Sequence, residues 1–231
     1  MKQRAIIIFG PPGAGKGTQA EFLAERHGFH HFETSQVLEA AFTQKDRDAI
    51  EVDGIVYPFT EEQRKFLAGE LCTPEVVAHF LKEAIEDFAR KGKSVVFSGS
   101  PRTQYESEAI LPVLEEQYGK EGICAFLLVC IPETSVARNS KRRICVVCRL
   151  PHPGMVEQEI LKECRRCGGE LTRRLGLDVE KVIWKRLQEF SERTMPGIDV
   201  ARKRGILVHE LDAEREAEEV FKDIEERLAK P

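Results

Sequence analysis

The chain has 231 residues, of which 42% are hydrophobic and 32% charged, and its formal net charge is −4. This balance predicts a globular protein with a buried core, built as one α/β domain with insertions or as two small domains. The net charge argues against a globally basic nucleic-acid-binding or membrane-surface protein. The N-terminal apolar run, residues 5–9, is too short for a signal-peptide core or a membrane span, so we expect a cytoplasmic protein.

Short apolar runs alternate with helical patterns along the chain. Residues 5–9 are typical of a strand buried on both faces of a parallel sheet. Further strands are predicted over residues 31–34, 94–97, 125–131 and 206–211. Helices are predicted over residues 20–26, 73–88 and 213–229. This alternation predicts a parallel sheet whose ligands bind beyond the carboxyl ends of its strands.

Two segments interrupt the alternation, and we interpret both as insertions. Residues 35–72 are rich in charge and contain the run VDGIVYPF at 52–59, which predicts a small hairpin or loop. Residues 144–172 contain two Cys-x-x-Cys pairs together with prolines and glycines.

A glycine-rich segment, GPPGAGKGT at residues 10–18, lies between the first strand and the first helix. Gly13 and Gly15 allow successive backbone N–H groups to point at a phosphate, and the helix N-terminus adds partial positive charge. Lys16 can reach the β- and γ-phosphates, while Thr18 can hold a phosphate oxygen or Mg²⁺. Unlike the strict P-loop pattern, Gly17 separates the lysine from the hydroxyl residue. We predict that ATP binds through Gly10, Pro12, Gly13, Ala14, Gly15, Lys16, Gly17 and Thr18.

The paired cysteines have the spacing of a zinc site. Cys145 and Cys148 form one pair, Cys164 and Cys167 the other, and fifteen residues separate the pairs. Four thiolates can bind one tetrahedral Zn²⁺, and such a site has no open position, so we expect a structural ion.

The charge around these cysteines suits a cover over polyphosphate. Residues 138–174 contain ten Lys or Arg and four Glu in a chain of net negative charge. A zinc ribbon that binds nucleic acid is an alternative, but this segment has no Phe, Tyr or Trp on which bases could stack. We therefore expect no nucleic-acid partner and no membrane association.

The glycine-rich segment resembles the phosphate loop of adenylate kinases and related nucleoside monophosphate kinases. Other segments resemble family motifs in the same order: Thr34-Ser-Gln-Val-Leu38, Gly69-Glu-Leu71, Ser98-Gly-Ser-Pro-Arg-Thr103, Arg138-Asn-Ser-Lys-Arg-Arg143, Arg186 and Thr194-x-Pro196. The Gly-Gly-Glu-Leu after the last cysteine resembles members with a zinc-bearing lid. The resemblance implies a P-loop NTPase fold: a five-stranded parallel sheet with flanking helices, interrupted by a monophosphate-binding insertion at 35–80 and a lid at 144–173.

The resemblance also implies roles for individual residues. Lys16 would serve the β- and γ-phosphates, and Arg138 would stack on the ATP base. Phosphoryl transfer spreads negative charge over oxygens, which arginine neutralises with planar, bidentate donors. The catalytic set implied in this way is Lys16, Arg102, Arg142, Arg173 or Arg174, and Arg186. The acceptor-binding set is Thr34, Leu71, Gly99, Arg102 and Glu106.

Four positions differ from the family pattern. Ser98 and Gln36 stand where the family has aspartates that organise water around magnesium, Glu39 replaces an arginine, and Glu106 replaces a glutamine that reads adenine. The main prediction is a monomeric nucleoside monophosphate kinase that uses Mg²⁺ with ATP and has AMP as acceptor. The alternative is a nucleotide-binding sensor of the same fold that has lost catalysis.

Overall fold

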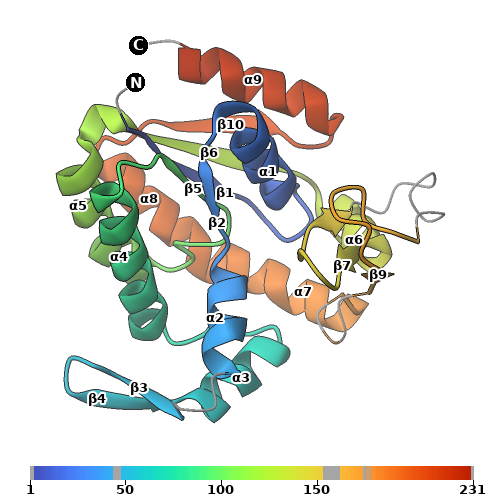
Figure 1. The fold of residues 1–231 in the computed structure, drawn as a ribbon, viewed down its shortest axis with the longest axis horizontal. Helices are drawn as coiled ribbons and strands as arrows, with labels where there is room; N and C mark the ends of the chain where they lie inside the picture. Colours follow the sequence, from blue (N-terminus) through green and yellow to red (C-terminus); the bar gives the residue numbers. More distant parts are fainter. Residues whose placement is uncertain (1–2, 44–47, 153–161, 174–175, 177, 230–231) are drawn as a thin grey trace.

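The structure is a computed structural model that describes residues 3–43, 48–152, 162–173, 176 and 178–229. At its centre lies a five-stranded sheet with the order β10-β6-β1-β5-β2, in which every pairing is parallel. The predicted α/β fold is therefore confirmed (Figure 1). The strands are β1 (Ala5–Phe9), β2 (His30–Phe32), β5 (Val95–Phe97), β6 (Ile123–Val129) and β10 (Val208–Asp212).

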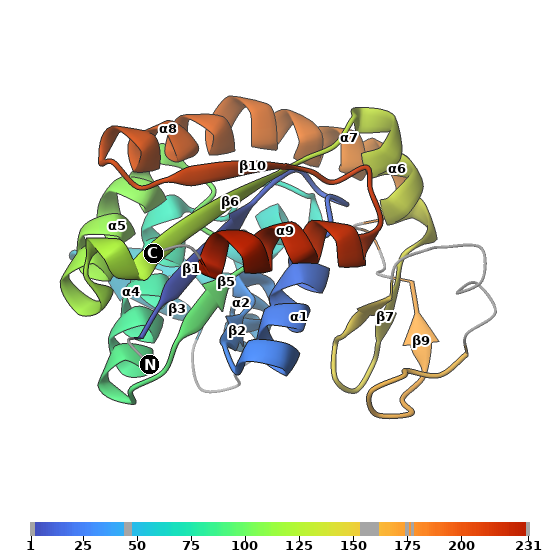
Figure 2. The same cartoon turned by 90° about the horizontal axis from the view of Figure 1, so that it is seen from above.

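Helices cover both faces of this sheet, which is why its central strands β1, β5 and β6 are apolar, whereas the edge strands β2 and β10 carry polar residues. Ile6 and Ile8 point to one face, against α1 (Lys16–His27) and α9 (Ala217–Ala229). Ile7 and Phe9 point to the other face, which packs against α4 (Pro74–Arg90), α5 (Gln104–Tyr118) and α8 (Met195–Lys203). Figure 2 shows α1 and α9 on one side of the sheet and α8 on the other. A short η1 (Lys120–Gly122) follows α5, and η3 (Phe190–Thr194) precedes α8.

The helix predicted over 213–229 begins later in the structure. The Asp212 carboxylate accepts from the backbone N–H of Glu214 at 2.9 Å, which stabilises a turn after β10, and α9 starts only at Ala217. The helix predicted over 73–88 is α4, with Pro74 in its first turn.

The first insertion contains two helices that the sequence did not predict, α2 (Thr34–Phe42) and α3 (Phe59–Leu67). Between them, β3 (Ala49–Val52) and β4 (Ile55–Pro58) form the expected hairpin, which starts earlier than residue 52. Asp53 and Gly54 both have positive φ at its turn, as a two-residue hairpin loop requires. Figure 1 shows the hairpin projecting from the core beyond α2 and α3.

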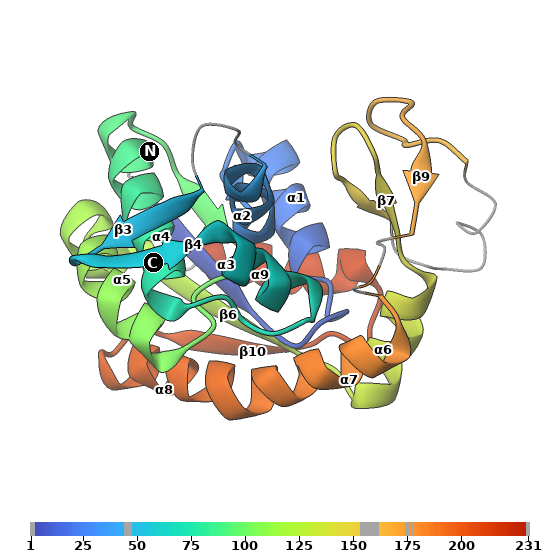
Figure 3. The ribbon, with the colours of Figure 1, turned by 90° about the horizontal axis from the view of Figure 1, so that it is seen from below.

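The second insertion, which we call the cysteine lid (residues 144–173), follows α6 (Pro132–Lys141) and precedes α7 (Glu180–Glu189). Its described part contains β7 (Arg143–Cys145), β8 (Pro151–His152) and β9 (Leu171–Thr172), paired antiparallel in the order β8-β7-β9. Figures 2 and 3 show this small sheet beside α1. Within the described ranges, no helix combines the length and apolar character that a membrane crossing requires.

Candidate functional site

The phosphate loop is held against α6 by close backbone contacts. Gly13 has φ +81, and a Cβ at this position would lie 2.5 Å from Asn139 Nδ2 and 2.8 Å from the Ser135 carbonyl oxygen. Ser135 also donates from Oγ to the carbonyl oxygen of Pro12. Gly15 has φ +92 and caps the N-terminus of α1. Glycine is therefore required at position 13 both for backbone conformation and for space.

Lys16, the first residue of α1, turns back over the loop. Its Nζ donates to the carbonyl oxygens of Gly10 at 2.7 Å and Pro11 at 2.8 Å. Burial and the nearby charges of Arg102 and Arg186 hold the pKa of Lys16 well below its usual value. Lys16, Arg102 and Arg186 thus place three positive charges close together, and a bound polyanion would offset their mutual repulsion.

A cavity of about 300 Å³ opens in front of the loop. We call it the loop cavity. The predicted ATP residues from Pro12 to Thr18 line it, together with Arg138 and Arg142; Gly10 borders the neighbouring cavity instead. The further charged residues around the loop cavity are Glu33, Arg102, Arg149, Arg186, Arg215 and Glu216.

Arg138 and Arg142 come from the end of α6. Arg138 donates from its guanidinium to the carbonyl oxygen of Ala213 at 2.7 Å, which fixes it beside the loop that leads to α9. Arg142 donates from Nε to the Asp178 carboxylate at 3.1 Å and makes a second, shorter bond to the same group. Arg186 Nη1 lies 3.7 Å from that carboxylate. One buried acidic residue, which the sequence analysis did not single out, thus orients two predicted catalytic arginines.

The two remaining arginines of the predicted set are placed differently. Arg173 is exposed and is not among the described residues that line the cavities. Arg174 lies outside the described residues.

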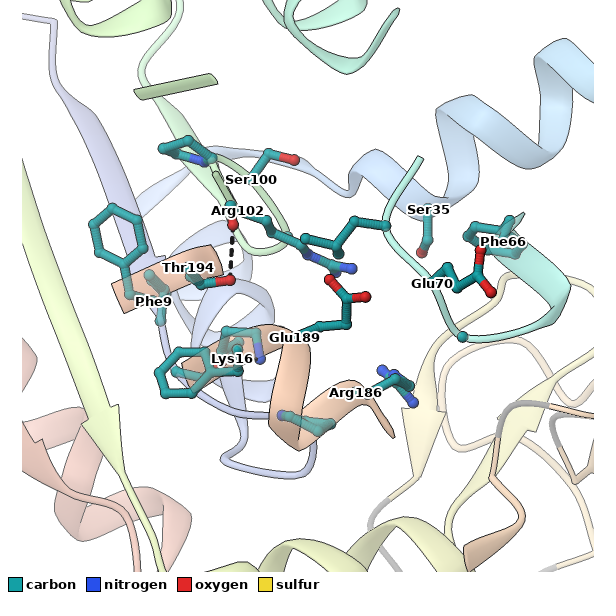
Figure 4. A pocket seen from close by; sticks show the side chains of 18 residues that line it. Phe9, Lys16, Ser35, Phe66, Glu70, Ser100, Arg102, Arg186, Glu189 and Thr194 are labelled. Atoms are coloured by element: carbon teal, nitrogen blue, oxygen red, sulfur yellow. Dashed lines mark hydrogen bonds between the residues drawn. The ribbon is translucent and has the colours of Figure 1, made fainter. Parts of the chain in front are cut away.

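A second cavity of about 80 Å³, which we call the acceptor cavity, lies on the other side of Lys16. Figure 4 shows Lys16, Arg102 and Arg186 around it, with Glu189 between them. Arg102 follows β5, and Thr194 Oγ1 donates to its carbonyl oxygen at 2.9 Å. Burial holds the pKa of Arg102 below its usual value, although the residue keeps its charge at any physiological pH. Gly99 and Leu71 also line this cavity.

Thr34 and Glu106 line a smaller hollow of about 30 Å³ beside Arg102. Thr34 Oγ1 is buried and has no hydrogen-bond partner among the described residues. The Glu106 carboxylate accepts from Arg102 N at 2.7 Å and from Thr103 Oγ1 at 3.1 Å, and burial raises the pKa of Glu106. Glu106 therefore stabilises the turn that carries Arg102, a role that the sequence analysis did not include.

The positions that depart from the family pattern have partners in this structure. The Ser98 Oγ lies 2.6 Å from His31 Nε2. Gln36 donates from Nε2 to the Glu33 carboxylate at 2.7 Å, and Ser35 donates to the other oxygen of Glu33. Glu33 directly precedes α2 and lines the loop cavity, so an acidic side chain is present there three residues before Gln36.

Glu39, which replaces a family arginine, lies on the same helix, α2. Its carboxylate pairs with Arg149 of the cysteine lid. The substitution thus connects the first insertion to the lid.

The four predicted metal ligands converge. The Sγ atoms of Cys145, Cys148, Cys164 and Cys167 all lie within 4.8 Å of one another. Backbone N–H groups of Val147 and Cys148 donate to the Cys145 sulfur, each at 3.4 Å. These bonds outweigh desolvation and lower the pKa of Cys145, which favours the thiolate form that a metal requires. The cluster fits one tetrahedral ion.

Comparisons with known proteins agree with this geometry. The adenylate kinase family model matches residues 8–206. An adenylate kinase of Archaeoglobus fulgidus is 33% identical over 228 residues, which cover 97% of this chain and 98% of that protein. Adenylate kinases of Caldanaerobacter subterraneus (31% identical; 96% of this chain and 95% of that protein) and Methanothrix thermoacetophila (30%; 97% and 98%) are similar over almost the same span.

Proposed function

Because this chain belongs to the adenylate kinase family, we propose that it transfers the γ-phosphoryl group of ATP to AMP and releases two molecules of ADP. One observation supports this most strongly. The loop cavity and the acceptor cavity meet at Lys16, Arg102 and Arg186, which line both. The triphosphate of ATP in the loop cavity and the phosphate of AMP in the acceptor cavity would meet at these cations.

The charges at this junction suit phosphoryl transfer. An oxygen of the AMP phosphate attacks the γ-phosphorus, the bond to the β,γ-bridging oxygen breaks, and its electron pair leaves with ADP. Lys16, Arg142 and Arg186 would neutralise the transferred group, while Arg102 holds the acceptor phosphate. Asp178 would keep Arg142 and Arg186 aimed at the junction. With the cysteine lid over the loop cavity, water is excluded from the attack.

We assign the two insertions, 35–80 and 144–173, to binding of the monophosphate and covering of ATP. Thr34 would contact the acceptor base, because its buried hydroxyl has no partner within the described part of the chain. Glu106 would influence acceptor binding by stabilising the turn that carries Arg102. Arg173 or Arg174 would join Arg142 and Arg186 around the transferred group. We also propose that the enzyme works in the cytoplasm as a monomer.

Adenylate kinases use magnesium with ATP, and the loop cavity offers oxygen groups that suit this hard cation. We assign it to Thr18, Ser98 and the carboxylate of Glu33, which all line the loop cavity. When bound, the ion neutralises phosphate charge. The cysteine cluster would hold a structural zinc ion that keeps the lid folded.

A catalytically inactive nucleotide sensor is the second candidate. It is favoured by Ser98 and Gln36, neutral residues at positions where the family has aspartates. The converging cations of the junction favour the enzyme.

A panel of acceptors separates the two candidates. Purified protein is supplied with ATP, magnesium and one of AMP, GMP, CMP or UMP, and nucleoside diphosphate formation is followed by chromatography. We expect ADP to form fastest with AMP. Tight binding of ATP without diphosphate formation from any acceptor would instead establish the sensor.

A further inference from the structure

A line of polar contacts runs from the cysteine lid to the floor of the loop cavity. Arg166, in the turn between two of the lid cysteines, pairs with the carboxylates of Glu21 and, at 2.8 Å, Glu25 on α1. The other oxygen of Glu21 lies 2.7 Å from Nδ1 of His31 on β2. Nε2 of His31 lies 2.6 Å from Oγ of Ser98, which follows β5 and lines the loop cavity.

The chemistry of these groups fixes the direction of the hydrogen bond between His31 and Glu21. An ionised carboxylate only accepts, so Nδ1 of His31 carries the proton and donates to Glu21. With a neutral ring Nε2 accepts from the Ser98 hydroxyl, and with a protonated ring Nε2 donates to Ser98 Oγ, so in both forms the bond to His31 orients Ser98. Burial would raise the pKa of Glu21, but the bonds from His31 and Arg166 lower it below its usual value, so the carboxylate is ionised.

The middle of this line is shielded from solvent. The side chains of His31 and Glu21 are only 8% and 15% exposed, and neither residue is among those that line the two cavities. Any influence of these residues on bound nucleotide must therefore pass through Ser98 at one end or Arg166 at the other. Hydrogen-bonded networks of this kind couple their members more strongly than isolated surface pairs do.

We propose that Glu21 and His31 are positioning residues that couple closure of the cysteine lid to the orientation of Ser98 at the triphosphate. When Arg166 docks on α1, it holds Glu21 in the geometry that orients His31, and His31 holds the Ser98 hydroxyl. The proposal deepens the proposed function, since it concerns the same ATP site. It requires only that nucleotide binds there.

The test is a double-mutant cycle on nucleotide affinity. The Kd of an ATP analogue with a non-hydrolysable β,γ-bridge is measured for the parent chain, Arg166→Ala, His31→Leu and the double variant. We expect Arg166→Ala to weaken binding in the parent, and this weakening to shrink by at least about threefold in the His31→Leu background. An absent effect of Arg166→Ala, or an equal effect in both backgrounds, would overturn the proposal.

A second lid ion pair provides the matched control. Arg149→Ala also removes one arginine that ties the lid to the rest of the protein, but its partner is Glu39 on α2 rather than Glu21. Its effect on analogue affinity should therefore be the same with and without His31. If the effects of both arginine substitutions on affinity depended equally on His31, the coupling would reflect general loosening of the lid. That result would contradict coupling through Arg166, Glu21 and His31.

Three further substitutions keep the test decisive if His31→Leu unfolds. Glu21→Gln preserves shape but removes the charge that Arg166 binds, and it should reduce the effect of Arg166→Ala in the same way. In a Ser98→Ala background, His31→Gln should no longer change affinity; a persisting change would contradict the role of Ser98. Because these measurements need binding and not turnover, they can fail while the acceptor panel succeeds, or the reverse.

Discussion

The carboxylate of Asp178 accepts two hydrogen bonds from the guanidinium of Arg142, with both side chains largely withdrawn from solvent. Arg186 approaches the same carboxylate from α7. Arginine can bind a carboxylate with two parallel bonds, and this geometry fixes the plane of the guanidinium. Asp178 therefore sets where two cations point before any nucleotide arrives.

Asp178→Asn should lower kcat by about tenfold to a hundredfold, because hydrogen bonds to charged groups contribute about 1.5–3 kcal/mol each. The amide keeps the shape of the carboxylate but loses its charge and one acceptor. Steady-state kinetics with ATP and AMP measure the effect. Glu115→Gln, which weakens the Arg204 pair far from the site, is the control and should leave kcat unchanged. Equal kcat values for Asp178→Asn and the parent would show that Asp178 does not position Arg142 and Arg186 for catalysis.

Gly13→Ala should weaken ATP binding by about tenfold or more, since the new Cβ collides with Asn139 and Ser135 and the backbone is strained at φ +81. Gly28→Ala is a matched control. It has φ +69 with no atom within 4 Å of the added Cβ, so it carries the strain without the collision. Calorimetric titration with ATP compares the two. Similar affinities for both variants would show that the contact with α6 does not shape the loop.

Glu21→Gln should change how stability depends on pH. The folded pKa of Glu21 is lowered from its usual 4.5, so in acid the unfolded chain binds the proton first. The stabilisation from the carboxylate is then fully present above pH 4.5 and is lost as the pH falls toward the folded value. The free energy of unfolding in urea is measured for both proteins from neutral pH to below pH 4.5. It should be larger for the parent than for Glu21→Gln at neutral pH, and this difference should shrink in acid. A difference that grows below pH 4.5 would refute the direction of the shift.

Freshly purified, reduced protein should contain about one zinc ion per chain. The Cys164→Ser variant should lose most of the metal. The Cys124→Ser variant should keep it, because Cys124 lies on β6, away from the cluster. Removal by a chelator should raise amide hydrogen exchange in the lid before it does so in the central sheet, because the small lid sheet has little core of its own. Full protection of the lid after complete metal removal would show that zinc does not hold it.

Much of the fold was predictable because its signals are local. The apolar run of β1, the glycines that follow it and the start of α4 at Pro74 depend on neighbouring residues only. The spacing of the cysteines is equally local, and their convergence is confirmed. Helices α2 and α3 were missed because each has only nine residues, and their apolar side chains are recognised as core only where they pack around Phe42 and Phe59.

The missed site residues depend on tertiary contacts. His31 meets Ser98 because β2 lies next to β5 in the sheet, an order that the sequence does not state. Asp178 meets Arg142 across the whole lid, a separation of 36 residues along the chain. The contact of the Glu106 carboxylate with its own turn could not be read from the sequence either, and the place of Glu106 in the acceptor-binding set stays a prediction.

The central claim is that ATP and AMP exchange a phosphoryl group at the junction around Lys16. The most direct test follows the label from [γ-³²P]ATP into ADP with AMP present, for the parent chain and for Lys16→Met. We predict label in ADP from the parent and a rate lower by a factor on the order of 10²–10³ in the variant, with folding and zinc content unchanged. Transfer at the full rate by a folded Lys16→Met protein, or no labelled ADP from the parent, would contradict the account.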